Sequence, residues 1–126
     1  MKLDVFFVDA FSSELFSGNP AAVIFSDLND DGLMQKIAAE NNLSETAFIN
    51  IENDVNHIRW FSPTTEVNLC GHATLASAFI YFNYIDTSKT EISFQSASGV
   101  LKVTNASDKY ELDFPKDNFK QVDQIQ

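Results

Sequence analysis

The sequence is poor in several residues that define common classes of small protein. Its 126 residues include one cysteine, four glycines and three prolines. One cysteine cannot form an internal disulfide framework, and a free thiol is typical of a reducing compartment such as the cytoplasm. Four glycines leave no phosphate-binding loop or dinucleotide fingerprint, and two distant histidines with one cysteine do not predict a metal cluster. We therefore expect a cytoplasmic protein that uses neither a cofactor nor a metal.

Basic residues are also scarce. The chain has 8 Lys and Arg against 18 Asp and Glu, a formal net charge of −10. This charge repels the nucleic-acid backbone and anionic membrane surfaces. No apolar run approaches the roughly 20 residues that span a bilayer, and the start of the chain lacks the basic region of a secretory signal. The sequence thus predicts neither a nucleic acid nor a membrane as partner.

Apolar residues, by contrast, are plentiful. They make up 44% of the sequence and include 12 phenylalanines. A chain of this length can bury one sizeable core but hardly two. We expect one domain over residues 1–115, followed by a polar linker or tail over residues 116–126.

Two helices and a set of strands are predicted from periodicity. Apolar residues recur at helical spacing between residues 29 and 42, with Asn29 or Asp30 available as N-cap and Asp31 in the first turn. This is the pattern of an amphipathic surface helix. Strands are expected where the sequence is β-rich or alternates apolar and polar side chains, in residues 3–11, 21–25, 46–51, 57–61, 91–95, 100–104 and 109–114.

The segment from His72 to Tyr84 differs from the first helix because small and large apolar residues are interleaved without a charge. A helix that is apolar around most of its circumference must be enclosed by other structure. The predicted fold class is therefore α+β: an antiparallel, barrel-like sheet wrapped around a central apolar helix, with one peripheral amphipathic helix.

Glu45 is an isolated carboxylate at the start of an apolar strand. Partial burial raises the pKa of a carboxyl toward neutrality and suits it to general acid/base catalysis. From the residues alone, a glutamate in this position is better explained as an exposed acid, or as part of a Ser-Glu turn that pairs with a nearby lysine.

Gly71 and His72 stand at the start of the apolar helix. The unpaired N–H groups of a helix N-terminus bind carboxylates, Gly71 permits a ligand to approach, and His72 can donate a hydrogen bond or relay a proton. Alternatively, Gly71 serves only a tight turn and His72 caps a backbone carbonyl. His57 has no such context, and we expect it to be structural or exposed.

Four motifs in order resemble those of the PhzF (phenazine biosynthesis-like) family. They are Gly18-Asn19-Pro20-Ala21-Ala22-Val23, Asn42-Leu43-Ser44-Glu45-Thr46-Ala47-Phe48, Arg59-Trp60-Phe61-Ser62-Pro63, and Glu66-Val67-Asn68-Leu69-Cys70-Gly71-His72-Ala73-Thr74-Leu75-Ala76. The resemblance implies a diaminopimelate-epimerase-like fold, in which two similar lobes face each other across the active site. The chain resembles the first lobe only, over residues 1–115.

The resemblance also implies roles for particular residues. Glu45 corresponds to the proton carrier of the family, while Gly71, His72 and the backbone amide of Ala73 would bind a substrate carboxylate. Asn19 and Ser44 would supply secondary contacts, although the Gly-Asn-Pro motif is also explained as a turn.

A third acid/base candidate is Cys70, because a cysteine just before the corresponding glycine acts in related racemases. Those enzymes pair two cysteines from two lobes, whereas this chain has one. We therefore interpret Cys70 as a small buried apolar residue in preference to a catalyst.

The leading hypothesis from the sequence is the half-site of a PhzF-like isomerase that transfers a proton on a small carboxylic acid. It requires a second lobe, or a second copy of the chain in a homo-oligomer. The alternative is a non-catalytic module that binds a small acid or another subunit.

Overall fold

The structure is a computed structural model and describes residues 4–8, 21–106 and 109–113. Predictions for Asn19 and for residues 116–126 fall outside this part of the chain. The strands are β1 (Asp4–Val8), β2 (Ala21–Phe25), β3 (Glu45–Glu52), β4 (Val55–Phe61), β5 (Glu66–Val67), β6 (Glu91–Ser96), β7 (Gly99–Ala106) and β8 (Lys109–Asp113). The helical segments are α1 (Asp31–Asn41), α2 (Gly71–Ile80) and η1 (Tyr81–Ile85), a π-helical turn.

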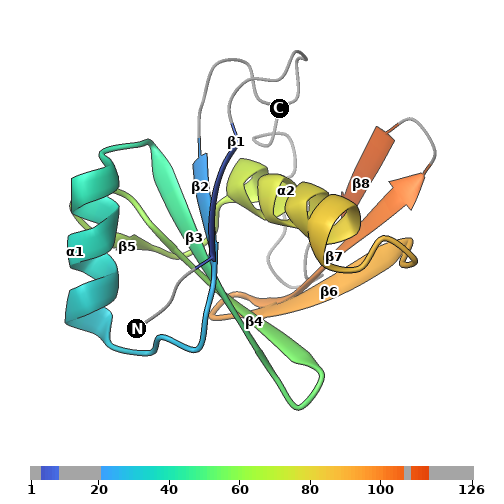
Figure 1. The fold of residues 1–126 in the computed structure, drawn as a ribbon, viewed down its shortest axis with the longest axis horizontal. Helices are drawn as coiled ribbons and strands as arrows, with labels where there is room; N and C mark the ends of the chain where they lie inside the picture. Colours follow the sequence, from blue (N-terminus) through green and yellow to red (C-terminus); the bar gives the residue numbers. More distant parts are fainter. Residues whose placement is uncertain (1–3, 9–20, 107–108, 114–126) are drawn as a thin grey trace.

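The described strands form one sheet in the order β1-β2-β3-β4-β6-β7-β8, with β5 paired to β4. The sheet curls around α2, while α1 lies outside it (Figure 1). This half-barrel confirms the predicted α+β class, a curved sheet around a central helix.

The pairing is more mixed than the sequence patterns indicated. Strands β2 and β3 are parallel, as are β4 and β6, and the other pairs are antiparallel. Parallel neighbours need a crossover connection, which α1 provides between β2 and β3. Alternation within a strand reveals its two faces but not the direction of its neighbour, so this feature was not predictable from the pattern.

The main core lies between α2 and the concave face of the sheet. The side chains of Ala73, Ala76 and Ala78 are fully buried there, and α2 packs against β2 and β3. Small residues let the helix backbone approach the strands closely, and the larger Trp60 and Phe94 fill the space around it. The enclosed position predicted for the apolar helix is therefore confirmed.

A smaller core lies on the other face of the sheet, under α1. Met34 and Ala38 of α1 pack there with Phe48. Asp30 is the N-cap, and its Oδ1 accepts a hydrogen bond from the Leu33 amide at 3.0 Å, as the sequence predicted. The helix ends where Asn42 adopts the left-handed conformation, with φ of 53°.

The second predicted helix changes form near its end. Helix α2 stops at Ile80 and continues as the π-turn η1, in which the Asp86 amide donates to the Tyr81 carbonyl at 2.8 Å. Tyr84 and Ile85 become exposed there. The wider π-turn rotates the residues that follow it relative to α2. The apolar sequence therefore extends beyond the part of the helix that the sheet encloses.

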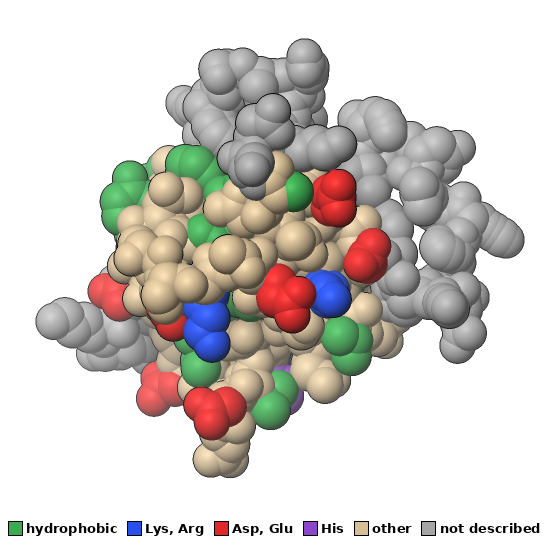
Figure 2. Space-filling view, turned by 90° about the vertical axis from the view of Figure 1, so that its right-hand side faces the viewer, with side chains coloured by type: hydrophobic (Ala, Val, Ile, Leu, Met, Phe, Trp, Pro, Cys, Tyr) green, Lys and Arg blue, Asp and Glu red, His purple; other side chains and the backbone are tan. Residues whose placement is uncertain are grey.

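Figure 2 shows the face on the β6 to β8 side, where the acidic and basic side chains of the described residues lie among apolar and other ones. Among the described residues, no helix has both the length and the apolar character needed to cross a membrane.

Candidate active site

Glu45 is the first residue of β3 and pairs in register with Ala21 of the parallel strand β2. Side chains alternate between the two faces of a strand. Ala47 and Ile49 belong to the core around α2, whereas Phe48 belongs to the core under α1. Glu45 therefore shares the concave face with Ala47 and Ile49, and it lies at the end of the sheet where α2 begins.

The start of α2 is fixed by two buried polar side chains. Trp60 Nε1 of β4 donates to Thr74 Oγ1 at 3.0 Å, and Thr74 Oγ1 donates to the Cys70 carbonyl at 2.8 Å. Cys70 is the N-cap residue, with extended backbone and no capping hydrogen bond from its side chain. The first amides of α2 are thereby held at one end of the sheet, where a helix N-terminus favours negative charge.

Glu45 and His72 meet at this helix start. Glu45 Oε1 lies 3.3 Å from His72 Nε2, and each side chain is 20% exposed. The alignment of the two groups is not that of a hydrogen bond, so the buried Glu45 Oε1 accepts none from the described residues. The carboxylate is therefore close to a donor and to the helix N-terminus while keeping a lone pair available for another group.

Cys70 completes the cluster. Its Sγ lies 3.9 Å from His72 Nδ1, and one ligand atom from each of Glu45, Cys70 and His72 can be chosen so that all lie within 4.8 Å of one another. Burial, and then the negative charge of Glu45, raise the pKa of the Cys70 thiol to about 12, although the amides of Ala73 and His72 oppose this shift. A thiol with this pKa is protonated at neutral pH and is a poor nucleophile or base.

The structure thus brings together Glu45, Cys70, Gly71, His72 and Ala73 at one end of the half-barrel. The Ala73 side chain is fully buried, and its backbone amide belongs to the first turn of α2.

Among the described glycines, Gly99 has a positive φ and Gly71 does not. The turn into α2 therefore does not require the left-handed conformation that glycine permits.

The structure does not test every sequence candidate. Ser44, next to Glu45, is exposed, and Asn19 lies outside the described residues. His57 is exposed on β4, as predicted.

Sequence reasoning missed the positioning pair Trp60 and Thr74, although a single tryptophan inside a strand pattern signals a buried donor that needs a partner.

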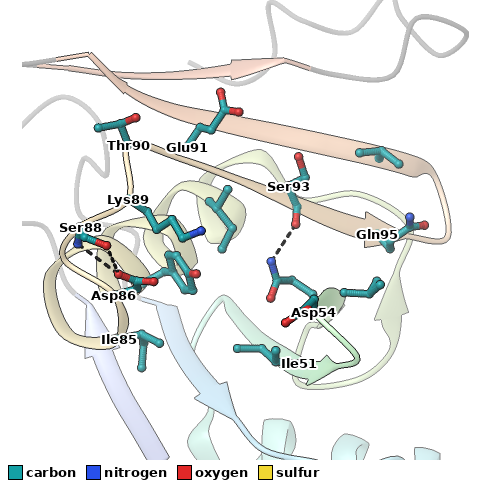
Figure 3. Close-up of a pocket in the computed structure, with 15 residues that line it drawn as sticks. Ile51, Asp54, Ile85, Asp86, Ser88, Lys89, Thr90, Glu91, Ser93 and Gln95 are labelled. Carbon is teal, nitrogen blue, oxygen red and sulfur yellow. Dashed lines mark hydrogen bonds between the residues drawn. The ribbon is translucent and has the colours of Figure 1, made fainter.

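A separate hollow of about 770 Å³ lies at the other end of α2, where η1, β6 and the β3–β4 hairpin meet (Figure 3). Its lining includes Asp86, Lys89 and Gln95 but not Glu45, Cys70 or His72. Asp86 accepts hydrogen bonds from the amide and hydroxyl of Ser88, and Asn56 Nδ2 donates to the Ser93 carbonyl. These hydrogen bonds join the end of η1 to the following turn, and β4 to β6, along the edge of the hollow.

A half-barrel around an enclosed helix is a fold that this chain shares with part of solved phenazine biosynthesis (PhzC/PhzF) proteins and with part of a predicted epimerase from Pseudomonas aeruginosa. The chain belongs to the phenazine biosynthesis-like (PhzC-PhzF) protein family, whose model matches residues 8–123.

Three relatives support this assignment. An uncharacterized isomerase of Pseudomonas aeruginosa is 51% identical over 116 residues, which are 91% of this chain and 44% of the relative. A human phenazine biosynthesis-like domain-containing protein is 44% identical over 124 residues, covering 91% of this chain and 43% of its own length. A solved phenazine biosynthesis PhzC/PhzF protein from Clostridium difficile superposes with a TM-score of 0.82 at 46% identity, over 90% of this chain and 44% of that one. The chain thus spans less than half the length of these relatives.

Proposed function

We propose that this chain supplies one half of the active site of a cofactor-independent isomerase that moves a proton between carbon atoms of a small carboxylic acid. The observation that carries the proposal is the 3.3 Å approach of Glu45 to His72 at the start of α2, with both side chains four-fifths buried. The membership of the family, whose relatives include named isomerases, supports the same chemistry.

In the proposed reaction the substrate carboxylate binds the backbone N–H groups of Gly71, His72 and Ala73, which carry the positive end of the α2 dipole. Glu45 as carboxylate removes a proton from one carbon, and as carboxylic acid returns it to another. His72 donates a hydrogen bond that orients the substrate. Asn19 and Ser44 would add secondary contacts when a substrate is bound. We place this activity in the cytoplasm.

The half-site needs a second wall to exclude water and to hold the rest of the substrate. That wall would be either a second lobe, corresponding to the half of the relatives that this chain does not cover, or a second copy of the chain. In a homodimer two Glu45 carboxylates would face one cleft, and their repulsion would raise the pKa of one of them.

The decisive experiment follows deuterium uptake. The chain is incubated in D₂O with a panel of hydroxy and amino carboxylic acids, alone and mixed with the separately produced C-terminal half of the Pseudomonas aeruginosa relative. Proton NMR then reports loss of substrate C–H signal. We expect uptake in the mixture, and a fall of at least about 100-fold in Glu45→Gln, the scale of a lost general acid/base.

The matched control is Glu52→Gln, because Glu52 is the exposed last residue of the same strand. It should exchange at the unmutated rate. Uptake that persists in Glu45→Gln would exclude Glu45 as proton carrier.

A second candidate function is a non-catalytic module that binds a small acid or another subunit. It requires only the amides at the start of α2 and the nearby His72, without proton transfer by Glu45. Native mass spectrometry separates the two: a strict monomer that binds an acid without exchanging deuterium, even with the second half present, would support the module.

A further inference from the structure

The proposed proton transfer uses Glu45 and His72 but leaves the Cys70 thiol without a task. The thiol is nevertheless part of the same cluster, since the ligand atoms of Glu45, Cys70 and His72 all lie within 4.8 Å of one another. These three groups, a carboxylate, a thiol and an imidazole, are three of the commonest ligands of zinc in proteins. They lie on two segments, the start of β3 and the start of α2, that the Trp60–Thr74 hydrogen bond helps to fix.

The distance between the Glu45 and His72 ligand atoms agrees with tetrahedral coordination. With ordinary zinc bond lengths, neighbouring nitrogen and oxygen ligands lie about 3.3 Å apart and sulfur lies roughly 3.6 Å from either. Glu45 Oε1 and His72 Nε2 are 3.3 Å apart. The sulfur lies 3.9 Å from the other ring nitrogen, Nδ1, and has to move toward Oε1 and Nε2 by rotation about the Cys70 Cα–Cβ bond.

We propose that Glu45, Cys70 and His72 form a binding site for a thiophilic divalent cation, of which Zn²⁺ is the best match, with the fourth position left to water. Glu45 Oε1 accepts no hydrogen bond from the described residues, so its lone pair is available to a cation. Thiolate and imidazole ligands disfavour Mg²⁺ and Ca²⁺, which take oxygen ligands, and a four-ligand arrangement favours zinc over octahedral metals.

Charge is balanced at this site. The cation displaces the thiol proton to solvent, and the metal–sulfur bond replaces the S–H bond. The Glu45 carboxylate and the Cys70 thiolate together neutralise the two positive charges of the cation. This neutralisation reduces the repulsion between the cation and the positive end of the α2 dipole. Without metal, burial and the negative charge of Glu45 keep the thiol protonated. A cation between the two groups reduces both effects and favours the thiolate.

Occupation of the site would block Glu45. A carboxylate that ligates a metal cannot also accept a proton from carbon, so Zn²⁺ should inhibit deuterium exchange in competition with the substrate. This consequence rests on the proposed function, whereas metal binding itself does not.

The test is direct titration of the metal-free full chain with Zn²⁺ by calorimetry, in the absence of any substrate. We expect one site per chain, and a loss of affinity of at least about tenfold in Cys70→Ala and in His72→Gln, since even outer partners of metal sites are worth that much. His57→Gln is the matched control, because His57 is the chain's other histidine and is exposed on β4. It should bind as the unmutated chain does.

Spectroscopy with Co²⁺ guards against a variant that fails to fold. Co²⁺ bound by the unmutated chain should show an intense sulfur-to-cobalt charge-transfer band in the near ultraviolet, which only thiolate ligation produces. No binding, equal binding by all variants, or Co²⁺ binding without this band would overturn the proposal. A chain that binds Zn²⁺ but exchanges no deuterium would support the metal site and overturn the proton transfer, so the two proposals fail separately.

Discussion

Two clusters of polar and charged side chains lie on opposite faces of the same sheet. The helix-start cluster, made of Glu45, Cys70 and His72, lies on the face that wraps α2. The outer cluster, made of Arg59, Glu66 and Asp31, lies on the face that α1 covers. Arg59 Nε and Nη2 each donate to Glu66 at 2.8 Å, and Nη1 lies 2.9 Å from Asp31.

The two clusters differ in how completely their groups satisfy one another. The Arg59 guanidinium has carboxylate partners for three nitrogens, and hydrogen bonding to Glu66 is the largest of the effects that raise its pKa. Its partners are 41% and 79% exposed, whereas Glu45 and His72 are each 20% exposed. The bidentate, solvent-facing pair of Arg59 and Glu66 holds secondary-structure elements together. The more buried Glu45 carboxylate keeps an acceptor position available and can change partners, as catalysis requires.

The largest expected difference between the clusters is in activity. His72→Gln should lower the deuterium exchange rate of the complemented chain by about 10- to 100-fold, the worth of a hydrogen bond to a charged group. Arg59→Gln should leave it within about twofold, because the guanidinium lies on the other face. Equal losses in the two variants would erase the distinction drawn between the clusters. Deuterium uptake measured by proton NMR decides this, with circular dichroism as the check on folding.

The next largest effect concerns the pH dependence of stability. The folded pKa of Cys70, about 12, lies above its ordinary value of 9.0. The thiol therefore ionises more readily in the unfolded chain. Its contribution to stability should be complete below pH 9 and should be lost as the pH rises toward 12, with a slope of up to about 1.4 kcal/mol per pH unit. Urea unfolding at several alkaline pH values measures the slope.

Cys70→Ala is the control for this slope, since the other titrating groups remain. The free energy of unfolding should fall less steeply with pH in the variant than in the unmutated chain. Parallel curves would contradict the pKa assigned to the thiol.

A smaller effect is expected where the helix-start cluster is anchored. Trp60→Phe keeps most of the ring volume but removes the 3.0 Å hydrogen bond to Thr74 Oγ1. We expect a loss of about 1 kcal/mol in the free energy of unfolding, typical of one buried hydrogen bond. If this hydrogen bond positions the start of α2, the rate of deuterium exchange into the substrate should fall along with the free energy of unfolding. Unchanged stability in urea unfolding would show that Thr74 is held without the indole.

The smallest effect is expected for the outer cluster. Arg59→Gln should reduce the free energy of unfolding by about 0.5–1 kcal/mol, because exposed ion pairs contribute little. The difference from the unmutated chain should shrink at high salt, where exposed charges are screened. Arg59→Lys should not restore full stability, since lysine cannot make the bidentate contact with Glu66. A loss well above this range, insensitive to salt, would mean that the outer cluster is more than a surface network.

Much of the site was predictable from local signals. The N-cap at Asp30, the enclosed helix after Gly71 and the acid at Glu45 each follow from the type of residue and its neighbours. The proposed metal-ligand set was not predictable from the sequence, because Glu45 precedes Cys70 by 25 residues and no local motif joins them. Such a set is visible only when β3 and α2 are placed together.

The sequence by itself determined where α1, α2 and the longer strands form, which faces are apolar, and that one apolar helix must be enclosed, but it did not predict β5 or the π-turn η1. Those features depend on side-chain periodicity and on interactions between near neighbours. Only the tertiary structure decided that β2 and β3 run parallel, that the first residue of β3 faces the start of α2, and that Glu45, Cys70 and His72 meet. Strand direction and the approach of distant segments depend on how the sheet curls around its core, and no local pattern specifies that curvature.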